Sequence, residues 1–249
     1  MNWDLPAGVH AVCTTRVGGV SKPPFEGFNL GDHVQDDSHA VAHNRALLQT
    51  QLGGVRPVFL SQVHGVDVAQ LHSGTPDGTI ADACVTQQSH IACTIMVADC
   101  LPLLFTDDAG HVVAAAHAGW RGLASGVIEK TLGTVCDLAG VSPAQIRVWL
   151  GPCIGPNAFE VGNDVRLAFA ATEAFAPLGG YFKSHPSHAG KWLADLAGLA
   201  RSRLHTQGVT SIAGNDSTPG WCTVSQRSRL FSYRRDGMTG RFAVCIWRD

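Results

Sequence analysis

Apolar residues along this chain gather in short runs, each about as long as a β-strand. Such runs, bounded by glycine and polar residues, are typical of strands. We expect strands at Val9 to Thr15, Val58 to Val63, Val66 to Leu71, Ile91 to Val97, Leu101 to Thr106, Val112 to His117, Ile146 to Leu150 and Phe242 to Trp247. Each run is shorter than the roughly 18 residues that a membrane-spanning helix needs, so the pattern predicts no membrane span.

Three longer segments carry apolar residues at helical spacing. We expect helices at Ser38 to Leu52, Trp120 to Ala139 and Trp192 to Gln207. Asp36 and Asp37 are candidate N-caps of the first helix, and Gly208 closes the third. Because some strands follow one another directly and others are separated by helices, the order predicts a mixed α/β (α+β) fold. No linker divides the chain, so we expect a single domain over residues 1–249.

Composition narrows the classes of function. Charged residues make up 15% of the chain, against roughly 25% in an average protein, while 45% of the residues are hydrophobic and 28 are glycine. The 18 Lys and Arg residues nearly balance the 20 Asp and Glu residues. This balance argues against a protein that holds nucleic acid by neutralising phosphates.

The eight cysteines lie mostly within apolar segments and lack C-x-x-C spacing. This pattern indicates buried, reduced thiols rather than a disulfide framework. The first residues show neither the basic nor the apolar region of a secretory signal. We therefore expect a cytoplasmic protein, in which only a cysteine in a polar setting is a candidate for chemistry.

Three metal-competent residues come at predicted strand ends, next to glycine or aspartate: His64, Cys100 and His117. Two histidines and one cysteine, with a fourth position open to water, form a known ligand set of catalytic zinc. Zinc lowers the pKa of its water to about 7 and so supplies hydroxide at neutral pH. The spacing of 36 and then 17 residues is no local metal signature, so hydrogen-bonded core residues remain an alternative.

Two other types of chemistry use parts of this set. Cys100 could act as a nucleophile with His117 as its base, as in cysteine hydrolases, although this leaves His64 without a role and places Asp99 beside the thiolate. An electron-transfer copper site has two histidines and a cysteine as ligands, with a weak axial methionine. A multicopper cluster needs many more histidines, and no two of the twelve are separated by a single residue.

The turn from Ala118 to Gly122 leads from a strand into a helix and contains Arg121. Unpaired backbone N–H groups and a nearby guanidinium favour a phosphate or carboxylate at such a place. The equally weighted alternative is that its glycines permit close packing. A second arginine pair, Arg234 and Arg235, is compatible with ligand contact or with bracing of the fold, and the sequence does not decide.

Ten short blocks, in order along essentially the whole chain, resemble the YfiH-type family. The blocks are Thr14 to Ser21, Phe28 to Gly31, Gln62 to Gly65, Ala81 to Ala83, Ala98 to Pro102, His117 to Gly122, Gly151 to Pro156, Phe159 to Val161, Phe231 to Arg235 and Thr239 to Arg241. This family was long described as multicopper polyphenol oxidase or laccase. It is now described as purine nucleoside phosphorylase with adenosine deaminase activity, and it has been linked to peptidoglycan editing.

The resemblance implies that His64, Cys100 and His117 bind one zinc ion. It implies a layered sandwich of mixed β-sheets flanked by helices, similar to the catalytic domain of cytotoxic necrotizing factor. The expected reactions are phosphorolysis of adenosine, inosine, guanosine or methylthioadenosine, and hydrolytic deamination of adenosine. The alternatives are a copper-dependent polyphenol oxidase and a Cys/His hydrolase that acts in peptidoglycan precursor editing.

Further site residues follow as hypotheses from that chemistry. Zinc deaminases use a separate carboxylate to carry the proton, and Asp82 and Asp99 are our candidates. Phosphorolysis needs a cationic cradle. For phosphate, ribose or base contacts we expect Arg16, Arg45, Arg121, Asn29, Asn44 and Gln62. The alternative is structural, since Arg45 lies on a predicted helix and both asparagines suit caps or turns.

Overall fold

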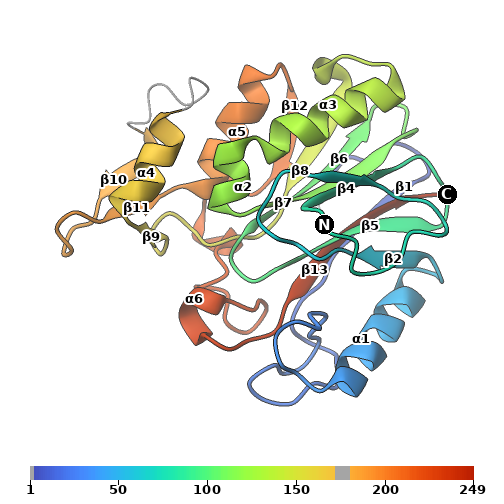
Figure 1. The fold of residues 1–249 in the computed structure, drawn as a ribbon, viewed down its shortest axis with the longest axis horizontal. Helices are drawn as coiled ribbons and strands as arrows, with labels where there is room; N and C mark the ends of the chain where they lie inside the picture. The colour runs from blue at the N-terminus through green and yellow to red at the C-terminus, as the bar shows by residue number, and fades with distance from the viewer. Residues whose placement is uncertain (1–2, 172–179) are drawn as a thin grey trace.

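Two β-sheets lie face to face, and helices cover their outer faces (Figure 1). The computed structural model describes residues 3–171 and 180–249. The four-stranded sheet has the order β1 (Val9–Cys13), β13 (Phe242–Arg248), β5 (Ile91–Val97), β2 (Arg56–Phe59). The six-stranded sheet has the order β12 (Ser211–Gly214), β8 (Ile146–Leu150), β6 (Leu101–Asp107), β7 (Val113–Ala118), β4 (Ala83–Thr86), β3 (Val68–Gln70). Each contains parallel and antiparallel pairs, so the predicted mixed α/β fold is confirmed.

Successive side chains along each strand point to opposite faces of its sheet. The buried side chains therefore form three layers, one between the sheets and one under the helices on each outer face. In β5, Cys93 and Ile95 pack between the two sheets, whereas Ala92 and Met96 pack toward α1 (Ser38–Gln51). On the other side, the six-stranded sheet packs against three helices. These are α2 (Trp120–Ser125), α3 (Val127–Ala139) and α5 (Leu196–Thr206).

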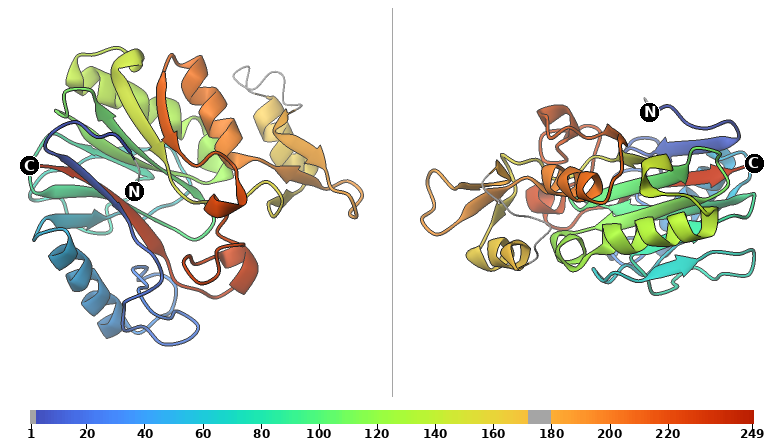
Figure 2. Two further views of the ribbon diagram at one scale, coloured as in Figure 1. Left: turned by 180° about the vertical axis from the view of Figure 1, so that it is seen from behind. Right: turned by 90° about the horizontal axis from the view of Figure 1, so that it is seen from above.

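A smaller unit projects beyond one end of the sandwich in both views of Figure 2. It contains an antiparallel sheet of order β10-β11-β9 together with a short helix. Its elements are β9 (Glu160–Val161), α4 (Asn163–Ala170), β10 (Phe182–Ser184) and β11 (Trp192–Ala194). The other short helices of the described residues are η1 (Pro143–Gln145), η4 (Pro219–Trp221) and α6 (Tyr233–Asp236). Within the described parts of the chain, no helix has both the length and the apolar character to cross a membrane.

Element boundaries differ from the prediction where local backbone chemistry intervenes. The helix expected from Trp120 to Ala139 divides at Gly126, whose φ of 98° is left-handed and ends α2 before α3 begins. The helix expected from Trp192 starts at Leu196 instead, because 192–194 form β11 and Asp195 caps the helix through the Gly198 N–H. The strand expected to run to Val63 ends at Phe59. The prediction that Asp37 caps the first helix is confirmed, since its side chain accepts a hydrogen bond from the His39 N–H.

Candidate metal centre

The two sheets bring the three predicted ligands together. Antiparallel pairing of β6 with β7 sets Pro102 opposite His117, so the turn that carries Cys100 lies beside the end of β7. Cys100 itself stands where the chain passes from β5 in one sheet to β6 in the other. His64 arrives from the loop between β2 and β3, which corrects the expectation that it ends a strand. The three ligand atoms lie within 4.8 Å of one another, with 3.8 Å between Cys100 Sγ and His64 Nε2.

Asp82 is buried and bonds to both histidine ligands. Its Oδ1 accepts from His117 Nδ1 at 2.8 Å and from the His64 backbone N–H at 2.9 Å. Its Oδ2 accepts from the N–H groups of Val63 at 3.1 Å and Gly65 at 2.6 Å. When the His117 ring is neutral, as metal binding requires, this hydrogen bond keeps the proton on Nδ1 and leaves a lone pair on Nε2. Second-shell carboxylates commonly arrange metal-binding histidines in this way. The predicted carboxylate therefore contacts the His117 side chain and the backbone of the His64 loop, and it is not among the residues that line the cavity.

Close approach explains the glycines of the turn after His117. A Cβ on Gly119 would lie 2.7 Å from His64 Cδ2 and 3.1 Å from Cys100 Sγ. A Cβ on Gly122 would lie 2.9 Å from the Gly65 carbonyl oxygen. The close packing expected of these glycines is therefore present, and the anion contact expected at the same turn stays a prediction.

The ligands perturb one another electrostatically. Burial alone would raise the pKa of Cys100, but His117 and His64 outweigh it and lower the pKa to about 6. Burial alone would lower the pKa of His117, but Cys100 and Asp82 outweigh it and raise the pKa to about 9. At neutral pH the metal-free protein thus holds a thiolate beside an imidazolium. Thiolate and imidazole are the ligand types that zinc and related ions select, so the donor set fits a metal ion.

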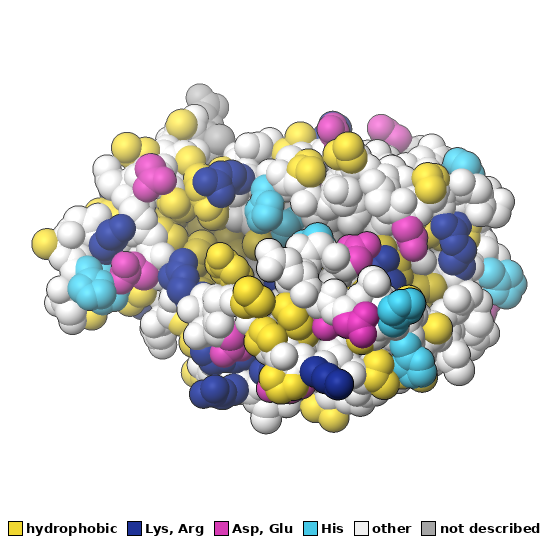
Figure 3. Space-filling model, turned by 60° about the horizontal axis from the view of Figure 1, so that its bottom comes forward, with side chains coloured by type: hydrophobic (Ala, Val, Ile, Leu, Met, Phe, Trp, Pro, Cys, Tyr) yellow, Lys and Arg dark blue, Asp and Glu magenta, His cyan; other side chains and the backbone are white. Residues whose placement is uncertain are grey.

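A cavity of about 490 Å³ opens over this centre. Its wall combines apolar and aromatic surface with cationic side chains, and Figure 3 shows a hollow of this mixed character on one face of the molecule. The residues include His33, Met96, Trp120, Arg121, Phe159, Leu196, Tyr233, Arg234 and Arg241. A pocket with apolar walls and a few convergent polar groups is typical of small-molecule sites.

Besides the three metal ligands, three predicted site residues line this cavity: Gln62, Asp99 and Arg121. The amide of Gln62 is already paired with the N–H and carbonyl groups of Met96, at 2.9 and 2.8 Å. The guanidinium of Arg121 lies over the Trp120 ring at 4.3 Å.

Asp99 has a left-handed backbone, with φ of 108°, and its carboxylate is held by three donors. These are the hydroxyl groups of Thr223 at 2.5 Å and Ser232 at 2.7 Å, and the N–H of Arg234 at 2.6 Å. Burial raises the pKa of Asp99 despite these hydrogen bonds. Asp99 therefore ties the metal-site turn to the C-terminal segment and also meets the cavity.

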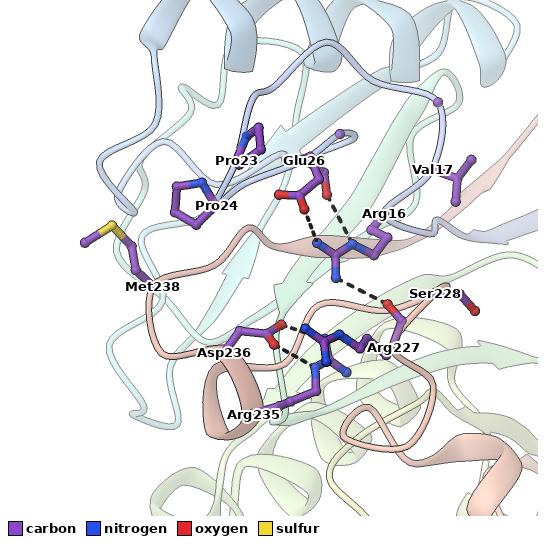
Figure 4. A pocket seen from close by; sticks show the side chains of 12 residues that line it. Arg16, Val17, Pro23, Pro24, Glu26, Arg227, Ser228, Arg235, Asp236 and Met238 are labelled. Carbon is purple, nitrogen blue, oxygen red and sulfur yellow. Dashed lines mark hydrogen bonds and ion pairs between the residues drawn. The ribbon is translucent and has the colours of Figure 1, made fainter.

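Arg16 lies in a different cavity, of about 830 Å³ (Figure 4). Its Nε donates to the Glu26 carbonyl at 3.1 Å and its Nη1 to the Arg227 carbonyl at 3.2 Å. Its guanidinium also lies 4.8 Å from the centre of the Phe231 ring. These contacts give Arg16 a bracing role in the structure, away from the metal ligands.

Arg45, Asn29 and Asn44 likewise lie outside the lining of the metal-site cavity. Arg45 lines a third cavity, donates to the Leu30 carbonyl at 3.0 Å and pairs with Asp32 at 3.2 Å. Both asparagines are fully buried. The amide of Asn44 donates to Ser21, Gly27 and Asn29, so these predicted ligand contacts are instead bonds that build the loops.

Several cavity residues escaped the sequence reasoning. Arg241 and Tyr233 belong to the C-terminal blocks that carry the family resemblance, and that block position was their only signal. His33 and Phe159 had no assigned role. They come from separate elements that only the tertiary fold brings to the metal centre.

A second group of metal-competent side chains lies in the projecting unit: Glu160, His185 and His188. His188 Nδ1 is 2.5 Å and His185 Nε2 is 3.3 Å from Glu160 Oε2. However, His185 Nδ1 accepts from the N–H groups of Ser187 at 3.1 Å and His188 at 3.0 Å. Its Nε2 must therefore carry the proton, and the group is a satisfied hydrogen-bond cluster.

Comparison with known proteins gives consistent matches over nearly the full chain. A family model described as multi-copper polyphenol oxidoreductase laccase matches residues 10–249. A purine nucleoside phosphorylase of Pseudomonas aeruginosa is 49% identical over 247 residues, covering 99% of this chain and 96% of that protein. The purine nucleoside phosphorylase YfiH of Escherichia coli is 46% identical over 247 residues, with 98% and 96% covered. The crystal structure of a Neisseria meningitidis DUF152 protein matches with a TM-score of 0.88 at 45% identity, covering 100% of this chain and 97% of that one.

Proposed function

Because this chain belongs to the YfiH/DUF152 family, we propose that it is a zinc-dependent purine nucleoside enzyme. It cleaves adenosine, inosine, guanosine or methylthioadenosine with phosphate, and it deaminates adenosine by hydrolysis. The observation that carries the proposal is the convergence of His64, Cys100 and His117 at a cavity with apolar walls that also contains arginine side chains. Zinc at this place would supply a Lewis acid and a source of hydroxide at neutral pH.

The chain's own residues divide the remaining work. Trp120 and Phe159 offer flat apolar surface for a purine ring. Arg121 offers a guanidinium without a carboxylate partner among the described residues, and an oxyanion is its natural complement. Asp82 keeps the ligands oriented. Asp99 meets the cavity with a raised pKa, caused by burial, and is the group we assign to proton transfer.

A cysteine hydrolase is the second candidate, because Cys100, His117 and Asp82 stand in the order of a nucleophile, base and orienting acid. It leaves His64 without a function. A multicopper oxidase, which the description of the family model suggests, requires several copper ions. In the group of Glu160, His185 and His188, the His185 nitrogens are already used in hydrogen bonds. Among the described residues, this leaves the His64, Cys100 and His117 set as a site for one metal ion.

These alternatives separate in one set of assays. We expect protein with one zinc per chain to convert adenosine to adenine when phosphate is present and to inosine when it is absent, with products resolved by chromatography. Chelation should stop both reactions. An enzyme that survives chelation but loses its activity on alkylation of Cys100 is a cysteine hydrolase. Oxygen uptake with phenols, by protein that holds several coppers, would establish the oxidase instead.

A further inference from the structure

The backbone on both sides of Arg241 is clamped, which fixes where its side chain leaves the chain. The Arg241 N–H donates to Asn29 Oδ1 at 2.8 Å, and its carbonyl accepts from Leu30 N–H at 3.1 Å. Asn29 Oδ1 also accepts from Gly31 N–H at 2.9 Å. A Cβ on Gly31 would lie 2.8 Å from Arg241 Cγ, so the aliphatic stem of the arginine lies directly against this glycine. The residue is preorganised before any ligand arrives.

Arg241 lines the metal-site cavity, and the described protein groups engage only part of its guanidinium. Its Nη1 donates to the carbonyls of Thr239 at 2.9 Å and Gly240 at 3.1 Å. Across residues 3–171 and 180–249, its Nε and Nη2 have no hydrogen-bond partner, and no carboxylate lies within 4 Å of it. A partly buried cation with two unpaired donors on one edge is a receptor for an oxyanion.

The rest of the cavity has the charge that an anionic ligand requires. Arg121 and Arg234 also line it. The acidic side chain in the described lining is Asp99, whose oxygens already accept from Thr223, Ser232 and Arg234 N–H. Fixed donors in a water-poor site stabilise negative charge more strongly than mobile ones do.

We propose that Arg241 binds the phosphate co-substrate in a bidentate manner through Nε and Nη2, with Asn29 and Gly31 as its positioning residues. This rests on the proposed phosphorolysis. A phosphate oxygen then forms a bond to C1′ of the ribose while the C1′–N9 bond breaks. The electron pair of that bond leaves with the purine, and the proton of monohydrogen phosphate ends on the purine. Arg241 holds the nucleophile and does not itself exchange a proton.

The test compares Arg241→Gln with wild type and with Arg227→Gln, an exposed arginine that lines the separate cavity of Figure 4. In zinc-loaded protein, Arg241→Gln should raise the KM for phosphate by about tenfold to a hundredfold, as loss of a bidentate charged contact predicts. The KM for inosine and the zinc content should stay within about twofold. Arg241→Lys, which keeps the charge without the fork, should fall between. Arg227→Gln should match wild type.

Calorimetry with inorganic phosphate and no nucleoside keeps the two proposals apart. If wild type phosphorolyses inosine and Arg241→Gln has an unchanged phosphate KM, the assignment of Arg241 is overturned and the proposed function stands. If wild type performs no phosphorolysis, the proposed function fails, and the calorimetry alone decides the anion site. Phosphate binding that is lost in Arg241→Gln then supports the assignment, and equal binding by both proteins overturns it.

Discussion

Two groups of three metal-competent side chains lie within residues 3–171 and 180–249, and their hydrogen bonds set them apart. At the centre formed by His64, Cys100 and His117, Asp82 accepts a hydrogen bond from His117 Nδ1, which leaves Nε2 for a metal ion once the ring is neutral. In the cluster formed by Glu160, His185 and His188, backbone N–H groups occupy His185 Nδ1, so its Nε2 keeps a proton. Proximity of ligand atoms is therefore insufficient to make a metal site, because the hydrogen bonds around each histidine also decide which ring nitrogen carries a proton.

The two groups also differ in their support. Cys100 and His117 stand at paired ends of β6 and β7, and Asp82 directly precedes β4 beside them. The cluster's histidines lie in the connection between β10 and β11 of the small projecting sheet. A centre that must hold ligands to a fraction of an ångström gains from sheet ladders. The following predictions test this contrast.

Removing a ligand of the metal centre should have the largest effect. His64→Ala and Cys100→Ala each delete a donor, so zinc per chain should fall from one toward zero and phosphorolysis should fall by more than about a hundredfold, beyond the usual effect of a supporting residue. Elemental analysis and product chromatography measure both. His185→Ala is the matched control and should retain zinc and activity. Full activity of His64→Ala would remove its role as a ligand.

The second-largest effect is expected in the pH dependence of alkylation of the Cys100 thiol at the metal centre. In metal-free protein the Cys100 pKa lies near 6 instead of 9.0, because His117 and His64 outweigh the effect of burial. Cys100 thus becomes a thiolate as pH rises through about 6, and its iodoacetamide modification, followed by mass spectrometry, should rise over that range. Zinc should protect it, and His117→Ala should move the midpoint upward. A midpoint near 9 in wild type would contradict the electrostatic account.

Asp82→Asn tests the supporting carboxylate. An amide has one acceptor oxygen, so it cannot receive the bonds that two carboxylate oxygens accept from His117 and the His64 loop. Zinc affinity should fall by about tenfold to a hundredfold, measured by competition with a chromophoric chelator. An unchanged affinity would mean that the ligands keep their orientation without Asp82.

Gly119→Ala should weaken zinc binding less severely. The new Cβ would meet His64 Cδ2 at 2.7 Å and Cys100 Sγ at 3.1 Å, so one ligand must shift. Gly133→Ala is the matched control, because nothing lies within 4 Å of its Cβ in α3. The control should stabilise the helix by up to about 1 kcal/mol and leave zinc affinity unchanged. Equal zinc affinity in both variants would show that the close approach has no consequence.

The smallest effect is expected at the projecting cluster. His188→Ala removes a hydrogen bond to Glu160 and should change zinc stoichiometry and phosphorolysis by less than about twofold. Zinc titration of the Cys100→Ala protein provides the sharper version, because a second site would then be measured by itself. If the Cys100→Ala protein still bound one zinc per chain and lost it when His188→Ala was added, the projecting cluster would be a metal site and the contrast between the two groups would be wrong.

The sequence predicts most strands of the two sheets from local apolar patterns, whereas it offers the ligand trio only as three candidates whose assignment rests on the family resemblance. Ile91 to Val97 and Ile146 to Leu150 match β5 and β8 residue for residue. β4 and β12 were not predicted, since each of these four-residue strands carries a single large apolar side chain, Val85 in β4 and Ile212 in β12. Gly126 carried a visible signal, because an interior glycine is a weak helix former, but apolar spacing on both sides of it continued the helical pattern.

The cavity wall was less predictable than the metal centre. Asn29 was expected to contact substrate, yet its side chain receives the Arg241 N–H and so positions a residue that lies 212 positions away. Such a pairing is set by β13 joining the four-stranded sheet, not by any local pattern. Arg16 and Arg45 have the right chemistry but lie in other cavities, because a residue's type does not determine which cavity it lines.

Formation of ribose 1-phosphate from inosine and phosphate, followed by ³¹P NMR, tests the central claim most directly. The sample would be measured as purified with zinc, after removal of zinc by a chelator, and after zinc is restored. We expect the ribose 1-phosphate signal in the first and third samples and its absence in the second. A signal of equal rate in all three would contradict a role for the His64, Cys100 and His117 centre in catalysis, and its absence from all three would contradict the phosphorylase itself.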